Sequence, residues 1–422
     1  MIALVDCNSF FCSVEKVFHP GLQNKPVCVL SNNDGCIVAL TPEAKKLGLR
    51  RGDPIFKVSD IVEHNNVTIF STNMYLYAAM SQRVYNILRS SVQHVERYSI
   101  DECILYLDGY EKHYNLEDFM RSIADKIKLY TDIPVSVGIA PTKTLAKMGS
   151  KFAKQYKGCR SVCLIDTDEK RRKALQLFDL ADVWGIGRHT LEKLNYLGIH
   201  TPFEFAEKKL SWVKANLYKP GYQTWLELNG IPCIETAEAV RNQTICTSRS
   251  FGNMVSDLAS LKASVATFAS SCANKLRGQH AAAKAVTVYL RSNRFRDDLD
   301  QYNNSGTWNF ITPTSDTMEI TRAALKIVEQ IYRPGILYKK SGVIVSEITD
   351  SRLIQHDLFD PISNRKERAE LMETIDHLNH RFGLKSIQLA VEGVQKQAWK
   401  VKCEHRSSNY LTDLNEILTI HI

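Results

Sequence analysis

Two adjacent carboxylates, Asp101 and Glu102, interrupt the apolar β-type sequence RYSIDECILYLDGY (97–110). Carboxylates in a half-buried strand are costly unless a positive group neutralises them. If residues 95–107 form a hairpin, the pair lies at or beside its turn, where neighbouring side chains can converge. The alternative interpretation is that both are ordinary polar turn residues, and their spacing alone does not separate the two.

A third carboxylate, Asp6, lies near the end of the first apolar segment, IALVDCN (2–8). In a ferredoxin-like sheet the first and third strands are commonly neighbours, so Asp6 would face the hairpin that carries Asp101 and Glu102. Three carboxylates on one surface repel one another, and hard divalent cations such as Mg²⁺ relieve the repulsion because they prefer oxygen ligands. Two such ions about 4 Å apart stabilise attack and departure in phosphoryl transfer. The three acids therefore suggest a two-metal site.

Four lysines form what we call the lysine row: Lys143, Lys147, Lys151 and Lys154. Their spacing of four, four and three residues puts them on one face of a predicted helix. The sequence has no acidic residue between positions 132 and 166 to offset them. One interpretation is a solvated basic face, and the other is an anionic ligand, such as a phosphate backbone, along the row.

Composition fits an ordinary folded protein of several domains. The 422 residues are 44% hydrophobic and 24% charged, and the formal net charge of +8 is compatible with a nucleic-acid partner. The 11 cysteines form no CxxC pair, so we expect reduced thiols in a cytoplasmic protein and no zinc site. No apolar run is long enough to span a membrane, and Asp6 comes too early for a signal peptide.

Strand-like and helix-like segments alternate over the first 165 residues. Without an insert at about 20–73 their order is βαββαβ, which predicts an α/β (α+β) ferredoxin-like sheet with helices on one face. The segment 175–206 predicts two short helices about the turn WGIG, where Gly185 and Gly187 leave backbone N–H groups free for a phosphate. Such a turn is often only structural.

A second α/β unit is expected over about 245–350, after a polar linker at 238–244. Its segment AVTVYLRS (285–292) alternates. Val286, Val288 and Leu290 point to one side, and Thr287, Tyr289 and Arg291 point to the other. With Arg249 nearby in sequence, the polar side suits a DNA backbone.

Three motifs resemble the palm motifs of the Y-family DNA polymerases: VDCNSFFCSVE (5–15), YSIDEC (98–103) and GIAPTKTLAKMGSKFAK (138–154). The resemblance covers nearly the whole chain in one register. LSNNDGCIVA (30–39) and QHDLF (355–359) are most similar to the UmuC-like members, the catalytic subunits of bacterial DNA polymerase V. The resemblance implies error-prone DNA synthesis across damaged template bases in the SOS response, by two-metal nucleotidyl transfer without proofreading.

The resemblance also implies roles for single residues. Asp6, Asp101 and Glu102 match the family's catalytic acids, which hold two Mg²⁺ ions, and Cys7 matches a residue that lends only its backbone carbonyl to a metal. The DNA would be contacted by the lysine row, by the turn at Gly185 and Gly187, and by Arg249 and Arg291.

Nucleotide binding is implied for two aromatic and two basic residues. Phe11 matches the steric gate that excludes a 2′-hydroxyl, and the adjacent Phe10 is also a candidate core aromatic. Lys45 and Lys154 match residues that contact the incoming triphosphate. Pro42 stands where many members carry a Tyr that also bonds phosphate, so triphosphate binding must depend on the two lysines.

The domains implied by the resemblance are those of a right-hand polymerase. They are a palm (1–20 and 74–165), fingers (21–73), a helix-hairpin-helix thumb (166–237), a linker (238–244), a little finger (245–352) and a C-terminal tail (353–422). Gln355, Leu358 and Phe359 in the tail resemble a sliding-clamp peptide, although the two apolar residues could instead staple the tail to the little finger. The rest of the tail, including DHLNHRFG (376–383) and SSNYLT (407–412), resembles the UmuC-type region that contacts a UmuD′-like dimer. A RecA-like filament is the further partner that the resemblance implies, with no membrane partner.

Two other functions compete with this interpretation. Another two-metal enzyme with a palm, such as a nucleotidyl cyclase, would need neither the helix-hairpin-helix turn nor the clamp peptide. A non-catalytic DNA-binding subunit would not need all three acids together with Lys154, and the sequence retains all four.

Overall fold

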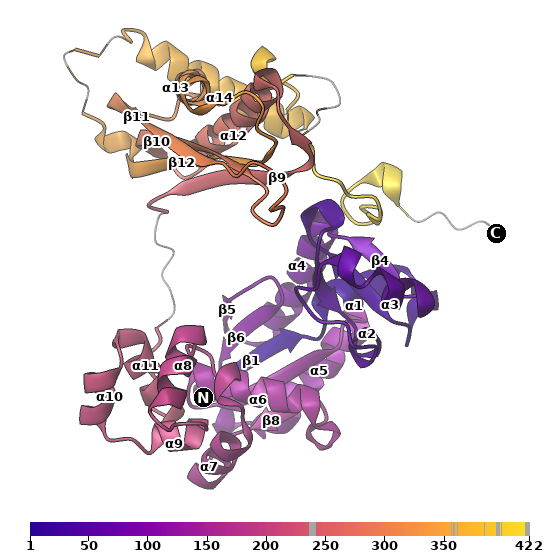
Figure 1. Cartoon of the computed structure of the whole chain (residues 1–422). Helices are drawn as coiled ribbons and strands as arrows, with labels where there is room; N and C mark the ends of the chain where they lie inside the picture. The colour runs from indigo at the N-terminus through magenta and orange to yellow at the C-terminus, as the bar shows by residue number, and fades with distance from the viewer. Residues whose placement is uncertain are drawn as a thin grey trace. The chain divides into compact units, whose positions relative to one another are not determined.

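The computed structural model describes residues 1–235, 242–355, 357, 359–360, 362–383, 385–393, 397 and 399–417. The chain forms two compact units (Figure 1). The first unit comprises residues 1–237 and 404–422, and the second comprises residues 238–403. In the part of the chain described, no helix has the length and apolar character needed to cross a membrane.

The central sheet of the first unit has the strand order β5-β6-β1-β7-β8 within the described residues. The strands are β1 (Ile2–Cys7), β5 (His94–Arg97), β6 (Glu102–Tyr106), β7 (Val135–Ala140) and β8 (Val162–Leu164). β7 and β8 pair in parallel, and the other pairs are antiparallel. β1, β5, β6 and β7, with the helices between them, make the predicted ferredoxin-like arrangement.

Helices cover both faces of this sheet, so the expectation of helices on one face was wrong. One face packs against α1 (Phe10–Phe18), α4 (Met74–Ser91) and α5 (Leu116–Thr131). The other face packs against α6 (Lys143–Gln155), with Leu4 and Ile104 in the shared core. β1 is apolar at every position from 2 to 5, and that continuous pattern is typical of a strand buried on both sides.

Gly138 on β7 lets α6 lie unusually close to the sheet. A Cβ atom at this position would lie 1.9 Å from the carbonyl oxygen of Ala146 and 2.2 Å from the backbone nitrogen of Ser150. Only glycine therefore permits this approach. The close packing fixes the helix, and with it the lysine row, against the strands that carry the acids.

Residues between α1 and α4 form a smaller sheet with the order β3-β2-β4 and its own apolar core. Its elements are β2 (Val27–Leu30), β3 (Ile37–Leu40), α2 (Pro42–Lys46), α3 (Ser59–His64) and β4 (Thr68–Ser71). This sheet occupies the stretch that the sequence pattern marked as an insert and that the resemblance assigned to the fingers.

A helical region follows β8. Its helices are α7 (Asp168–Leu177), α8 (Arg188–Tyr196), α9 (Pro202–Ala206), α10 (Leu210–Asn216) and α11 (Lys219–Leu228). Gly185 has a φ of 94°, and a Cβ atom there would lie 2.2 Å from Thr224 Oγ1, so the WGIG turn needs glycine. The predicted tight turn is present, and α8 begins directly after Gly187.

The second unit contains an antiparallel sheet with the order β11-β10-β12-β9 in its described part. Its elements are β9 (Ile245–Val255), α12 (Leu258–Gly278), β10 (Ala281–Ser292), β11 (Asn303–Thr314), α13 (Thr317–Ile331) and β12 (Tyr338–Asp350). Val286, Val288 and Leu290 are fully buried in the same core as residues of α12 and α13. The predicted alternation of β10 is therefore confirmed.

Residues predicted as one tail are divided between the two units. The helix α14 (Arg365–Phe382) is ion-paired to the second unit, where Arg277 bonds Asp376 and Arg365 bonds Glu319. Residues 404–417, which we call the return segment, belong to the first unit. Residues 238–241 of the predicted linker lie outside the described residues. The assignment of palm, fingers, thumb and little finger stays a prediction.

Candidate active site

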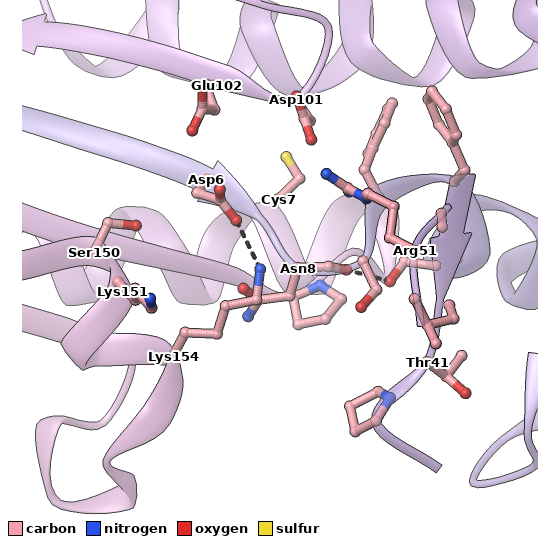
Figure 2. Close-up of a pocket in the computed structure, with 18 of the residues that line it drawn as sticks. Asp6, Cys7, Asn8, Thr41, Arg51, Asp101, Glu102, Ser150, Lys151 and Lys154 are labelled. Carbon is pink, nitrogen blue, oxygen red and sulfur yellow. Dashed lines mark hydrogen bonds and ion pairs between the residues drawn. The ribbon is translucent and has the colours of Figure 1, made fainter. Parts of the chain in front are cut away.

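A cleft of about 1670 Å³ opens in the first unit. It is lined by the turn between β1 and α1, the start of α2, the turn between β5 and β6, and one side of α6. Besides the three acids, the lining includes eight residues singled out from the sequence: Cys7, Phe10, Phe11, Pro42, Lys45, Lys147, Lys151 and Lys154. Segments far apart in the sequence thus supply one opening (Figure 2).

The three predicted acids lie together at this opening (Figure 2). Asp6 on β1 is the direct partner of Glu102 on β6. Asp101 precedes β6, and its carbonyl accepts a 2.9 Å hydrogen bond from the Cys7 N–H. Ser99 Oγ donates to Asp101 Oδ1 at 2.6 Å and accepts from the Glu102 N–H at 3.0 Å. The turn is therefore bound to the end of β1, which brings the carboxylates together.

The positive groups that neutralise two of these acids come from the lysine row. Lys154 Nζ lies 3.0 Å from Asp6 Oδ1, and Lys147 Nζ lies 3.1 Å from Glu102. The Lys147 ammonium also lies 5.2 Å from the ring centre of Tyr98 and 5.6 Å from that of Trp184. Aromatic faces attract cations, so these rings help to hold Lys147 beside the carboxylates.

Glu102 shows the electrostatic cost of the cluster. Burial raises the pKa of Glu102, Lys147 lowers it, and the charges of Asp6 and Asp101 raise it further. The net effect is a pKa above the ordinary value for Glu. A second cation near these acids would oppose the repulsion, because an opposite charge favours the ionised form of a carboxylate.

The other two lysines of the row do not reach the acids. Lys143 is buried, and its Nζ lies 2.9 Å from Glu96 Oε2, so it does not share an exposed basic face with the others. Lys151 pairs with Asp182 at the edge of the cleft. Acids distant in sequence therefore offset the whole row. The expectation of an uncompensated stripe was wrong, and Lys143 is placed inside the protein and not towards a phosphate.

Phe10 and Phe11 differ in environment although they are adjacent. Ser9 has a φ of 46°, and this left-handed turn reverses the chain between β1 and α1. Phe10 is 3% exposed and belongs to the core. Phe11 is half-buried, and its ring stacks on Tyr77 with centres 4.5 Å apart and planes at 16°. Both rings line the cleft, but Phe11 is the less buried of the two and is the one that stacks on Tyr77.

The basic side of the cleft comes from α2 and the residues after it. Lys45 is exposed and lines the cleft. Pro42 begins α2 behind Thr41, whose Oγ1 accepts from the Ala44 N–H at 3.4 Å, so proline here serves the helix start. Arg51 also lines the cleft (Figure 2), and sequence reasoning missed it. The adjacent pair Arg50-Arg51 was the available signal.

A buried carboxylate from α11 fixes the start of α6, and no local sequence pattern predicts this contact. Glu227 is 1% exposed. Its Oε2 accepts from the Thr144 N–H at 3.0 Å, and its Oε1 accepts from the Cys233 N–H at 2.9 Å. Thr142 Oγ1 donates to the Glu227 carbonyl at 2.9 Å. The helical region is thus hydrogen-bonded to the helix that carries the lysine row.

The predicted DNA-binding arginines lie on different sides of the second unit's sheet. Arg291 on β10 pairs in register with Lys340 on β12, and Arg249 on β9 pairs with Ser341. Ser341 Oγ contacts Ser264 of α12 at 3.0 Å, so its side chain points to the helix-covered side. Consecutive residues of a strand point to opposite sides, so Lys340 and Arg291 lie on the open side and Arg249 does not.

The clamp-like motif lies between β12 and α14. Gln355 is exposed, and Phe359 is 81% exposed, while Leu358 lies outside the described residues. The exposure of Phe359 does not fit a staple onto the second unit. The assignment of this motif to a clamp stays a prediction.

The carboxylate cluster is compatible with hard divalent cations. Among the residues that the structure describes, no three His, Cys, Asp or Glu side chains are arranged as ligands of one metal, and Asp6 and Glu102 are held by lysines. The carboxylate oxygens at the cleft are the kind of ligand that Mg²⁺ prefers to nitrogen or sulfur. Their mutual repulsion gives a cation a reason to bind there.

Comparison with known proteins assigns the family. Residues 5–151 match the model of the impB/mucB/samB family, residues 242–358 match the model of its C-terminal domain, and residues 369–420 match a domain of unknown function. The chain is 38% identical to protein UmuC of Salmonella typhimurium (strain LT2) over 422 residues, 100% of each chain. It is 26% identical to DNA polymerase IV of Oceanobacillus iheyensis over 388 residues, 90% of this chain and 88% of the relative.

A solved Y-family DNA polymerase chimera of Dbh and Dpo4 matches with a TM-score of 0.65 at 23% identity, over 82% of this chain and 99% of the other. This likeness confirms the predicted polymerase fold. The full-length identity to UmuC, together with the two matched family models, confirms the predicted family. The chain belongs to the impB/mucB/samB family, the UmuC-like branch of the Y-family DNA polymerases.

Proposed function

We propose that this chain is the catalytic subunit of an error-prone DNA polymerase that extends primers across damaged template bases, as in SOS mutagenesis. The observation that carries the proposal is the meeting of Asp6, Asp101, Glu102 and Lys154 in one cleft. The chain's relatives include UmuC over its full length and DNA polymerase IV over 90% of it. This family membership favours a DNA polymerase over a nucleotidyl cyclase or a non-catalytic subunit.

Y-family DNA polymerases use divalent metal ions, and we assign the site in this chain to two Mg²⁺ ions. Asp6, Asp101 and Glu102, with the backbone carbonyl of Cys7, would hold them. Bound ions would activate the primer hydroxyl and stabilise the departing pyrophosphate. Lys154, which lies against Asp6, would contact the triphosphate of the incoming nucleotide.

The remaining contacts follow from the position of each group at the cleft. The Phe11 ring would pack under the deoxyribose, and Lys45 and Arg51 would add positive charge beside the triphosphate. Backbone N–H groups at the start of α8, after Gly187, would bind a DNA phosphate, as would Lys151 and Arg291. Such contacts position a duplex without reading its sequence, which suits synthesis on damaged templates.

Three protein partners are proposed on the resemblance to UmuC. A sliding clamp would bind the segment from Gln355 to Phe359, whose described apolar member is exposed. A UmuD′-like dimer would bind the C-terminal region that follows this motif, and a RecA-like filament is the third proposed partner. The cytoplasm is the compartment in which all of these would meet.

Primer extension on undamaged and abasic templates tests the proposal. The wild-type chain, assayed with Mg²⁺ and the proposed partner proteins, is expected to extend both templates. Asp101→Asn and Glu102→Ala should each reduce incorporation at least about a hundredfold, because the developing charge loses its stabilisation. DNA affinity should be retained, since the duplex is bound by other elements. Glu111→Ala, an exposed acid outside the cleft, is the matched control. Near-normal extension by either cleft variant would contradict the proposed site.

A further inference from the structure

The return segment packs against the side of α1 and the strand β4. Tyr410 stacks on Phe18 with ring centres 4.8 Å apart and planes at 19°. The Ser71 N–H donates to the His405 carbonyl at 2.9 Å, and the His405 N–H donates to Ser71 Oγ at 3.0 Å. These contacts combine backbone pairing with ring stacking, so the segment is built into the first unit.

The segment also holds the start of α4. Asn73 is 1% exposed, and its Oδ1 accepts from the Leu76 N–H at 3.3 Å, which caps the helix. Its Nδ2 donates to the carbonyl of Ser407 at 2.9 Å and to that of Ser408 at 3.4 Å. One side chain therefore joins the helix start to residues that follow more than 300 positions later.

A buried carboxylate lies at the centre of this contact. Glu15 of α1 is 0% exposed, and its Oε1 accepts from the Tyr77 hydroxyl at 2.6 Å and from the Ser407 hydroxyl at 3.0 Å. Its Oε2 has no hydrogen-bond partner within the described residues. Burial raises the pKa of Glu15, whereas the two hydroxyl donors lower it. Each hydroxyl is therefore important, because a buried carboxylate is costly without donors.

The same tyrosine supports the aromatic residue at the cleft. The Tyr77 ring is fully buried and stacks on the Phe11 ring at 4.5 Å. Its hydroxyl is bound to Glu15 at the other end. The contacts thus run from Ser407 through Glu15 and Tyr77 to Phe11, and each step is a hydrogen bond or a ring stack between described residues.

We propose that Ser407 is a positioning residue for sugar discrimination, which acts through Glu15 and Tyr77 to fix the Phe11 ring at the cleft. The inference rests on the proposed function, in which Phe11 excludes a 2′-hydroxyl. It gives a role to part of residues 369–420, which match a domain of unknown function. A gate excludes by clash, so it works only while its ring is held in one place.

The test measures kcat/KM for a ribonucleotide and for the matching deoxyribonucleotide on one primer-template, using the full chain. The variants are Ser407→Ala, which removes the hydroxyl, and Tyr77→Phe, which keeps the ring but removes its bond to Glu15. Ser407→Thr keeps a hydroxyl and tests for rescue. Ser408→Ala is the matched control, because its hydroxyl makes no hydrogen bond in the part of the chain described. Phe11→Ala, alone and with Ser407→Ala, completes a double-mutant cycle.

We expect Ser407→Ala and Tyr77→Phe to raise the ratio of ribonucleotide to deoxyribonucleotide kcat/KM about three- to tenfold, a coupling typical of residues in one network. Ser407→Thr and Ser408→Ala should match the wild type. On the Phe11→Ala background, Ser407→Ala should add nothing, because the ring it positions is gone. If Ser407→Ala does not fold, the inference is decided by the ratio of ribonucleotide to deoxyribonucleotide kcat/KM in Tyr77→Phe and by the double-mutant cycle of Tyr77→Phe with Phe11→Ala.

Four results would overturn the inference. An unchanged ratio in Ser407→Ala and Tyr77→Phe, with a relaxed ratio in Phe11→Ala, would remove Ser407 and leave the proposed function standing. Effects of Ser407→Ala and Phe11→Ala that multiply would show that Ser407 acts by another route. A wild-type chain without polymerase activity, or a Phe11→Ala variant with an unchanged ratio, would overturn the inference together with the function or gate on which it rests.

Discussion

Asp6 on β1 and Glu102 on β6 are direct partners across two antiparallel strands, and each carboxylate is bound by a different lysine of α6. One helix on one face of the sheet therefore neutralises both acids. Gly138 makes this possible, since any side chain there would push α6 away from β7. The protein itself thus balances two of the three negative charges of the cluster before any cation binds.

Replacing Lys147 with Met should shift the acid limb of the pH–activity profile to higher pH. Lys147 lowers the pKa of Glu102, while burial, Asp6 and Asp101 raise it. Without the lysine the pKa of Glu102 rises further, so more of the residue is protonated at a given pH and fewer molecules can bind metal. The profile is measured by single-nucleotide incorporation at limiting Mg²⁺. Lys151→Met is the control, because Lys151 pairs with Asp182, and an equal shift in both variants would contradict the argument.

Phe10→Ala and Phe11→Ala should have separable effects. Phe10 is 3% exposed in the core, so its truncation should cost about 3–5 kcal/mol of unfolding free energy. Phe11 is half-buried at the cleft, so its truncation should cost less stability but admit ribonucleotides. Urea unfolding and the ribonucleotide to deoxyribonucleotide ratio are measured on both variants. If sugar selection is relaxed in Phe10→Ala but not in Phe11→Ala, the assignment of the gate to Phe11 is wrong.

Glu227→Ala should destabilise the first unit by about 2 kcal/mol or more, because the buried Thr144 N–H and the partly buried Cys233 N–H would lose their acceptor. Glu227→Gln keeps one carbonyl oxygen and should lose less. Thermal unfolding of the full chain gives the measurement. Glu207→Ala, at an exposed acid of the same helical region, is the control. Equal stability of Glu227→Ala and the wild type would show that this contact does not hold α6.

Replacing Gln355 and Phe359 with Ala should remove stimulation by a loaded sliding clamp and leave extension of short primers unchanged. Phe359 is 81% exposed, so it has little packing to lose, and burying it in a partner would contribute about 1.5–3 kcal/mol. Extension is compared with and without the clamp. A variant with a melting temperature lowered by several degrees and normal clamp stimulation would identify the motif as a structural staple.

The attachment of α14 should weaken at acidic pH. Hydrogen bonds from Arg365 are the main reason that the pKa of Asp360 is well below its usual range. A depressed carboxyl pKa stabilises the folded state above the unfolded value of about 3.9, and that stability is lost as the pH falls towards the folded value. Asp360→Asn should therefore be less stable than the wild type at pH 5–8, with the difference shrinking below about pH 4. Hydrogen exchange in α14 of both proteins measures this difference in stability. A difference that does not change with pH would contradict the role given to the Asp360 carboxylate.

The acids, the palm-like sheet and the alternation of β10 could be predicted because they depend on local patterns. Asp101 and Glu102 interrupt an apolar strand, and this interruption can be recognised in the sequence before the fold is known. The partners of the lysines could not be predicted in the same way. Glu96 and Asp182 lie tens of residues from Lys143 and Lys151, so their pairing is a consequence of tertiary packing.

The strands β9 and β11 were missed because they contain many Ser, Asn and Thr residues. Each lies at an edge of its sheet, where an apolar pattern is not required. Glu227 was also missed, because an acid in a helix is expected at the surface unless the backbone N–H groups that donate to it are known. Sequence reasoning likewise treated residues 353–422 as one tail, since no local pattern marks a segment that packs against an earlier part of the chain.

The return segment makes the first unit discontinuous, and this affects the order in which the protein can fold during synthesis. Asn73 and Glu15 leave the ribosome early, but the hydroxyl and carbonyl groups of Ser407 that they bind follow only after the whole second unit has been made. Domains generally fold as units from the N-terminus during synthesis. Until then the first unit contains a buried acid with incomplete hydrogen bonding, and it reaches its final form only after the return segment has been made.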